Sequence, residues 1–222
     1  MCTLVHMSEP APPPPADRPG DPLAGDPRSM AQRMRDGDWY RAVDDPEITE
    51  AAHRGIELAE AYNATSSRQE ALRAELLHRL LGAVGEGTAI RPPLHVDYGT
   101  NLRMGARCFA NFGLTALDVA AITIGDDVQI GPHVQLLTPT HPLDPELRRG
   151  GWEAAAPITI GDGVWLGGGV VVCPGVTIGS GTVVGAGSVV TRDLPPRVLA
   201  VGSPARVVRS LDDDAGVAGR GA

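Results

Sequence analysis

The chain has 222 residues, enough for one sizeable domain with a smaller appendage and a substantial hydrophobic core. Its formal charge is -8 at pH 7 and its pI is near 5.2, and the basic residues are scattered. This argues against nucleic acid or an anionic membrane as the main partner, because both require clustered Lys and Arg. With three Trp, three Tyr and two Phe, the core must be built mainly from aliphatic side chains.

The cysteine pattern and the N-terminus give no sign of an extracytoplasmic protein. Cys2, Cys108 and Cys173 cannot all pair within one chain and show no CxxC spacing, so neither a disulfide framework nor a zinc knuckle is indicated. The chain does not open with a basic region followed by an apolar stretch, and it has no run of about 18 apolar residues that could span a bilayer. We therefore expect a cytoplasmic protein that needs no metal.

Three helical segments are expected in the N-terminal third. The first is short and covers about Ser29–Asp36. The second covers about Asp45–Tyr62 and has proline at its first helical position, where the missing N–H is tolerated. The third opens with a capping box at Ser67–Glu70. Its leucines share one face that needs a surface to pack on: Leu72, Leu76, Leu77 and Leu80.

Aliphatic residues recur every six positions in the second half of the chain. They are Ile124, Ile130, Leu136, Ile160, Leu166, Val172, Ile178, Val184 and Val190. Glycine often follows the aliphatic residue, and a small or β-branched residue comes four positions after it. A helix would need a period of 3.6 residues and would not tolerate this many glycines. A β-sandwich keeps no strict period, so short strands stacked as the rungs of a solenoid fit best.

These patterns divide the chain into segments. Residues 1–28 are rich in proline and predict a disordered leader. Residues 29–90 are expected to form the helical cap, and residues 91–208 the coil of strands. Within the coil, residues 142–157 cannot continue the repeat and are expected to project as a loop, a common place for functional residues. Residues 209–222 are expected to form a flexible tail.

Further motifs accompany the repeat between about Gly37 and Val208. They include Gly37–Tyr40, Asp45–Glu47, Asp97–Gly99, Phe109–Phe112, Leu117–Asp118, Thr140–Pro142, Val164–Gly167, Val190–Asp193 and Gly202–Arg206. With these motifs the chain resembles the hexapeptide-repeat acyltransferases, and among them the maltose and galactoside O-acetyltransferases. The resemblance implies a mainly β fold, a left-handed parallel β-helix with an N-terminal α-helical cap. It also implies a homotrimer with active sites between subunits, and acetyl-CoA as the acyl donor.

One position departs from the family pattern and bears on the acceptor. In galactoside enzymes an acidic residue that touches the acceptor follows the aromatic residue that matches Tyr40. Here Arg41 and Ala42 occupy that stretch, and the nearest acidic residues are Asp44 and Asp45. The identity of the acceptor therefore stays open.

Transfer of an acyl group to a hydroxyl needs a base whose pKa is close to neutral, and histidine is the natural choice. Four of the six histidines are set aside: His6 is in the leader, His53 and His78 are on predicted helices, and His95 precedes the first clear turn of the coil. His133 and His141 remain. His133 fills a turn position inside an unbroken repeat, which suits a packed or solvated side chain. His141 lies where the repeat breaks, in Thr138–Pro142. By resemblance, His141 is the general base.

The resemblance also assigns binding residues. Asp97, Asn111 and Asp118 are expected to hold the acceptor, because carboxylates and amides suit the hydroxyls of a polyol. We expect Asn111 and Asp118 to point toward the His141 cleft from a stacked rung. Positions implied to contact the CoA donor are Trp165, Gly167, Ala186, Thr191, Arg192 and Arg206. The two arginines suit phosphate oxygens, with which a guanidinium pairs well.

The sequence thus predicts an acetyl-CoA-dependent O-acetyltransferase that acts on a hydroxyl of a sugar or another small molecule. Attack is expected to be direct, in a ternary complex, with no acyl-enzyme. Acetylation of an amine, or of an antibiotic-like or secondary metabolite, remains an alternative on the same scaffold. So does a β-helical binding module without catalysis. A zinc hydratase is the weaker enzyme alternative, since the spacing of His133 and His141 does not match the histidine trio of the β-helical carbonic anhydrases.

Overall fold

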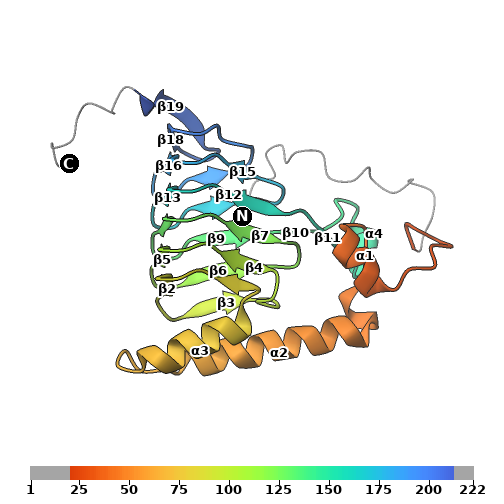
Figure 1. Cartoon of the computed structure of the whole chain (residues 1–222). Helices are drawn as coiled ribbons and strands as arrows, with labels where there is room; N and C mark the ends of the chain where they lie inside the picture. The colour runs from red at the N-terminus through yellow and green to blue at the C-terminus, as the bar shows by residue number, and fades with distance from the viewer. Residues whose placement is uncertain (1–20, 213–222) are drawn as a thin grey trace.

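The computed structural model describes residues 21–212 and shows a coil of parallel strands with helices across one end (Figure 1). The strands stack in three sheets, and each complete turn of the coil contributes one strand to each sheet. The predictions for residues 1–20 and 213–222 lie outside the described residues. The predicted fold class, a β-helix with a helical cap, is confirmed.

The three sheets follow the coil from the helical end upward. The first sheet consists of β1 (Ala83–Val84), β4 (Leu102–Met104), β7 (Ile122–Ile124), β12 (Ile158–Ile160) and β15 (Thr177–Ile178). The second consists of β2 (Ala89–Ile90), β5 (Phe109–Ala110), β8 (Gln129–Ile130), β13 (Trp165–Leu166), β16 (Val183–Val184), β18 (Val198–Val201) and β19 (Arg206–Ser210). The third consists of β3 (Leu94–Val96), β6 (Leu114–Leu117), β9 (Gln135–Leu137), β14 (Val171–Val172) and β17 (Val189–Val190).

The six-residue repeat forms the core of the coil. All nine aliphatic residues of the repeat are at most 2% exposed, because each points inward from its short strand. Equivalent residues stack in register from turn to turn, as Ile124, Ile160 and Ile178 do in the first sheet. The small residues four positions later are buried at the turns. The predicted solenoid is confirmed at each of these positions.

The coil begins earlier than residue 91, at β1. Val84, Ile90 and Val96 pair with Met104, Ala110 and Ala116, and these pair with the first residues of the predicted repeat. The steps within each turn are again six residues. The step from the third sheet back to the first is eight, from 96 to 104 and from 116 to 124, so two extra residues interrupt the period there. This interruption hides the first two turns from a search for a strict repeat.

The helices form where they were predicted, with one different cap. Ser29 caps α1 (Met30–Asp36) in a capping box with Gln32, and the Asp45 carboxylate caps α2 (Pro46–Asn63), with the 3-10 turn η1 (Ala42–Asp44) just before it. In α3 (Glu70–Leu80) the predicted box at Ser67 does not form. The side-chain oxygen of Gln69 accepts a bond from the N–H of Ser66 instead, and Gln69 itself is the N-cap.

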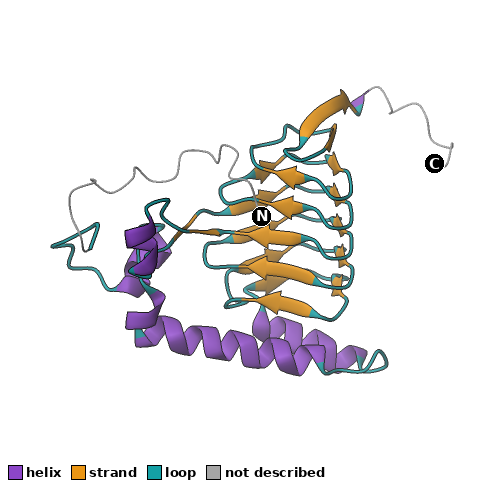
Figure 2. Ribbon diagram, turned by 180° about the vertical axis from the view of Figure 1, so that it is seen from behind, coloured by secondary structure: helices purple, strands orange, loops and turns teal. Residues whose placement is uncertain are grey.

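Helices α2 and α3 cover the lower end of the coil (Figures 1 and 2). Leu76, Leu77 and Leu80 are buried in the same core as the strands, whereas Leu72, which was predicted on that face, is 39% exposed. At the end of α2, the Asn63 side chain bonds both backbone groups of Leu94, each at 2.8 Å. The amide therefore satisfies backbone groups of β3 that would otherwise need a neighbouring strand as their hydrogen-bond partner.

Residues 21–28 are packed against α1, which corrects the predicted extent of the leader. The Arg33 side chain is 3% exposed and its guanidinium bonds the Asp21 carboxylate at 2.8 and 2.9 Å. It also donates to the carbonyl oxygens of Leu23 and Asp26. A buried charge needs such partners, and these hold the segment in place. The predicted tail also starts too early, since residues 209 and 210 belong to β19.

Residues 142–157 do leave the coil, but they are not irregular. The segment carries α4 (Pro145–Arg149) and forms a hairpin in which β10 (Pro139–Thr140) pairs antiparallel with β11 (Ala154–Ala155). The hairpin lies beside α1 in both views (Figures 1 and 2). The cap, the hairpin and the coil thus meet along one edge.

Two edges of the coil carry most of the predicted site residues. The loop corner is the edge between the third and first sheets, formed by residues 97–101, 118–121, 138–157, 173–176 and 191–193. The Asn111 corner is the edge between the second and third sheets, formed by residues 91–93, 111–113, 131–134, 167–170 and 185–188. The third sheet separates the two corners.

Candidate active site

The hairpin at the loop corner places His141 next to a carboxylate. Pro139 is opposite Ala155 and Thr140 is opposite Ala154, so the next position in this register sets His141 opposite Glu153. On its other side, Glu153 exchanges two backbone hydrogen bonds with Tyr40, both 3.0 Å. Three extended segments, from the cap and from both arms of the hairpin, therefore run side by side here.

His141 is exposed, and its ring has a backbone partner. Its Nδ1 lies 3.5 Å from the carbonyl oxygen of Trp152. A carbonyl oxygen can only accept, so this contact favours the tautomer with the proton on Nδ1. That tautomer leaves the lone pair of Nε2 available to take a proton from a bound molecule.

The groups beside His141 form a half-buried acidic cluster. Burial raises the pKa of Glu153, while the His141 charge and a hydrogen bond with the Tyr40 hydroxyl lower it. Burial, followed by the charges of Asp118 and Glu153, raises the pKa of Asp97 to about 6. Burial also raises the pKa of Tyr40 and of Tyr98, so both hydroxyls stay protonated. The cluster offers hydrogen-bond acceptors and donors next to a basic nitrogen.

Asp118 is fully buried and holds the turn that carries Asp97. Its Oδ1 accepts from the N–H groups of Asp97 and Tyr98, at 3.1 and 2.9 Å, and its Oδ2 accepts from the N–H of Asn101 at 3.0 Å. Both oxygens are thus engaged by the backbone. In this chain the carboxylate fixes the 97–101 turn and does not open onto the surface.

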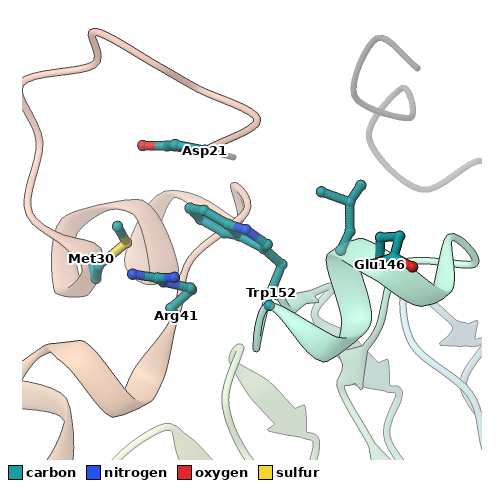
Figure 3. Close-up of a pocket in the computed structure, with 7 residues that line it drawn as sticks. Asp21, Met30, Arg41, Glu146 and Trp152 are labelled. Atoms are coloured by element: carbon teal, nitrogen blue, oxygen red, sulfur yellow. The ribbon is translucent and has the colours of Figure 1, made fainter. Parts of the chain in front are cut away.

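A pocket of about 300 Å³ lies on the other face of the hairpin (Figure 3). Successive side chains of an extended strand alternate in direction, so Trp152 points away from the side of Glu153. The Trp152 ring packs with Trp39 and Ala154, and the Arg41 guanidinium lies 5.3 Å from the ring centroid. The lining comprises Asp21, Met30, Arg41, Glu146, Leu147, Gly150 and Trp152.

Asn111 lies at the other edge of the third sheet. Its side-chain oxygen accepts from the N–H of Phe112 at 2.9 Å, and the Arg91 guanidinium lies between the rings of Phe109 and Phe112. Within one chain, the structure therefore does not bring Asn111 to the cleft of His141, contrary to the expectation from stacked rungs. The two residues occupy different corners.

The predicted donor residues are also divided. Gly167 and Ala186 are at the Asn111 corner in successive turns, and Trp165 is 56% exposed on the outer face of the second sheet. A Cβ at Gly167 would lie 2.5 Å from the backbone nitrogen of Ala186, so this turn requires glycine. Thr191, buried, and Arg192, exposed, are at the loop corner above His141, while Arg206 is exposed on β19.

Two family models match the chain. The maltose acetyltransferase hexapeptide capping motif matches residues 33–85, and the bacterial transferase hexapeptide (six repeats) matches residues 157–192. Nodulation protein L of Rhizobium meliloti (strain 1021) is 47% identical over 180 residues, which are 81% of this chain and 98% of that protein. The chain belongs to the hexapeptide-repeat acetyltransferases of the maltose and galactoside type.

Solved structures agree with this assignment. A maltose O-acetyltransferase from Clostridium difficile 630 is 39% identical with a TM-score of 0.82, covering 83% of this chain and 98% of its own. A galactoside acetyltransferase in complex with coenzyme A is 40% identical with a TM-score of 0.81, covering 84% of this acetyltransferase and 93% of its own chain. The resemblance seen in the sequence is thereby confirmed.

Three further findings concern His133, metal ligands and membrane-spanning helices. His133 is exposed in a left-handed turn with φ of 57°, and its ring lies against Gly113 of the turn below. Among residues 21–212, no group of three or more His, Cys, Asp or Glu side chains is arranged to hold a metal ion. In the same part of the chain, no helix is both long and apolar enough to cross a membrane.

Sequence reasoning missed Glu153 as a site residue of the acetyltransferase. It lies in a short run, Trp152–Ala156, with no alternation of polar and apolar residues that would mark a strand. Only the pairing of that run with β10 reveals that it faces His141. Tyr40, from the cap, lies next to Glu153.

Proposed function

We propose that this acetyltransferase moves the acetyl group of acetyl-CoA to a hydroxyl of a sugar or another small molecule, with His141 as the general base. The observation that carries the proposal is an exposed histidine whose Nδ1 faces a backbone carbonyl, beside a half-buried acidic cluster at the junction of cap, hairpin and coil. Membership of the maltose and galactoside type supports the reaction class.

The chemistry requires one proton to move twice. Nε2 of His141 takes the proton of the acceptor hydroxyl as its oxygen attacks the thioester carbonyl carbon. The C–S bond then breaks, and the imidazolium returns the proton to the CoA thiolate. No acyl-enzyme forms, because the acceptor oxygen attacks the donor directly. Asp97, whose pKa of about 6 leaves it mostly ionised at pH 7, accepts hydrogen bonds from the other hydroxyls of the acceptor.

The donor residues suit the parts of CoA. The exposed ring of Trp165 offers a flat surface to the pantetheine arm, next to the glycine turn at Gly167. Arg192 and Arg206 are exposed guanidinium groups, which pair with phosphate oxygens. The galactoside acetyltransferase that resembles this chain was solved with coenzyme A, which supports a CoA site on this scaffold.

The division of residues between two corners supports a homotrimer with active sites between subunits. His141 and Asp97 are at the loop corner, whereas Asn111, Gly167 and Ala186 are at the Asn111 corner. A complete site forms when the loop corner of one subunit meets the Asn111 corner of the next. Such contacts join two different surfaces, and contacts of this kind close into rings.

A screen of acceptors with acetyl-CoA, followed by thiol release, tests the reaction. Maltose, galactosides and glucosides form the hydroxyl arm, and arylamines and amino sugars form the amine arm. Turnover confined to amines would favour the N-acetylation alternative. His141→Ala should lower kcat by about 10²–10⁴ with little change in CoA affinity, as expected for loss of a general base. Near-normal turnover by this variant would exclude His141 as the base.

Mixed trimers test whether the sites are shared. His141→Ala and Asn111→Ala are each expected to be nearly inactive alone. If one site takes His141 and Asn111 from different subunits, every mixed trimer contains one intact site. Random mixing of equal amounts should then restore about a quarter of the wild-type activity. No recovery in demonstrably mixed trimers would place both residues in the same subunit's site.

A further inference from the structure

The hairpin has two faces, and His141 shares its face with Glu153 and Tyr40. Residues directly opposite one another in antiparallel strands project to the same side. Ala155, two positions after Glu153, is accordingly packed in one cluster with Tyr40. Ala154 is packed on the other face in the cluster of Trp39 and Trp152. The row His141, Glu153, Tyr40 therefore crosses three neighbouring segments on one side.

Glu153 is the carboxylate of this row that interacts with the histidine. The carboxylate is half-buried and hydrogen-bonded to the Tyr40 hydroxyl, and a positive charge on His141 acts to lower its pKa. The other ionisable groups facing the cluster are Asp97 and Asp118 from the loop corner, and Tyr98 between them. Asp118 is held by backbone N–H groups.

We propose that Glu153 is a positioning residue for His141, whose charge stabilises the imidazolium formed when the acceptor hydroxyl gives up its proton. The inference rests on the proposed function of His141 as the base. Glu153 does not itself take the proton. It remains an anion throughout, and the transferred proton returns from Nε2 of His141 to the CoA sulfur. The Tyr40 hydroxyl donates to Glu153 and holds its carboxylate in place.

The row explains why the cap is joined to the hairpin at this point. The two backbone bonds between Tyr40 and Glu153 fix the carboxylate laterally, and the contact between Nδ1 and the Trp152 carbonyl fixes the ring. Because Trp152 and Glu153 are adjacent, a single backbone segment supplies both the carbonyl that faces Nδ1 and the carboxylate whose charge acts on the imidazole. An interaction between a half-buried anion and a developing cation is stronger than it would be between fully solvated groups.

Three variants test the proposal, with a matched control on the same projecting segment. Glu153→Gln removes the charge and keeps the shape, Glu153→Asp keeps the charge, and Tyr40→Phe removes the hydroxyl that holds it. Asp144→Asn likewise removes a charge and keeps the shape, at the exposed N-cap of α4, outside the pocket lining. We expect Glu153→Gln to lower kcat about 10–100-fold with an unchanged KM for acetyl-CoA, and Tyr40→Phe to lower it less. Glu153→Asp should restore part of the loss, and the control should match wild type.

The pH profile separates positioning from a structural role. Loss of the anion makes the imidazolium less stable, so the rising limb of kcat/KM should move to lower pH by roughly half a unit or more in Glu153→Gln. NMR titration of the His141 C2–H signal should show the same displacement without any substrate. A wild-type titration midpoint in a folded Glu153→Gln protein would overturn the proposal. If the wild-type protein showed no acetyl transfer, the proposed reaction would be refuted. A displacement of the His141 titration by Glu153→Gln would still establish the interaction between His141 and Glu153.

Discussion

Replacing Asp118 with Asn changes one oxygen of a fully buried carboxylate into an NH₂ group at nearly constant volume. The two oxygens now accept three backbone bonds, of 2.9 to 3.1 Å, within the 97–101 turn. An amide nitrogen cannot accept, so one or two N–H groups lose their partner whichever way the amide lies. Hydrogen bonds to charged groups contribute roughly 1.5–3 kcal/mol each, so the free energy of unfolding should fall by about 2–4 kcal/mol.

For a domain of this size, such a loss lowers Tm by about 5–15 °C. The assay is thermal unfolding at one fixed protomer concentration, because the stability of an oligomer depends on concentration. The exposed Asp162 accepts a single backbone bond of 2.8 Å, which an Asn oxygen can keep. Asp162→Asn is therefore the control and should stay within about 2 °C of wild type. If Asp118→Asn retained the wild-type Tm but raised the acceptor KM, the carboxylate would contact the acceptor, and its role as a turn anchor would be refuted.

Two further predictions follow from buried charges. The pKa of Asp97 is 3.8 in an unfolded chain and about 6 here, so ionisation opposes folding and stability is lost as the pH rises through this interval. The free energy of unfolding of Asp97→Asn should therefore exceed that of wild type by roughly 1–3 kcal/mol at pH 7 and should equal it at pH 3, measured by urea unfolding at both values. An equal difference at the two pH values would show that ionisation of Asp97 is not the cause. Deleting residues 1–20 should leave the free energy of unfolding unchanged. Deleting residues 1–28 also removes the partners of the buried Arg33 guanidinium and should lower it by about 3–5 kcal/mol, measured by the same assay. Equal stability after the two deletions would show that residues 21–28 contribute nothing.

The parts of the fold that repeat were predictable from the sequence. A side chain such as Leu166 is fixed by its own strand and by the aliphatic neighbours Ile130 below and Val184 above, so the local pattern carries the tertiary information. The first two turns of the coil were not recognised in the sequence, because two extra residues at the loop corner break the six-residue period. These insertions are where Asp97 and Asp118 are found, so the irregularity of the repeat marks the site.

The candidate site was only partly predictable, because it depends on contacts between distant segments. His141 was recognisable from the break in the repeat and from resemblance. Glu153 was not, since its place opposite His141 is set by the register of a hairpin without alternating residues. The sequence analysis also failed to predict that residues 21–28 are ordered. Their proline content says nothing about contacts with other segments, and it is Arg33 in α1 that holds them in place.

Both ends of the coil are closed by groups that are not turns of it. At the lower end, the Asn63 amide takes up the backbone groups of Leu94, and at the upper end β19 runs antiparallel to β18 and presents exposed, charged positions. Open strand edges would invite a second coil to add on, as in a growing fibril. The molecule therefore has a fixed length set by its two end groups, and it could gain or lose whole turns between them without becoming a polymer.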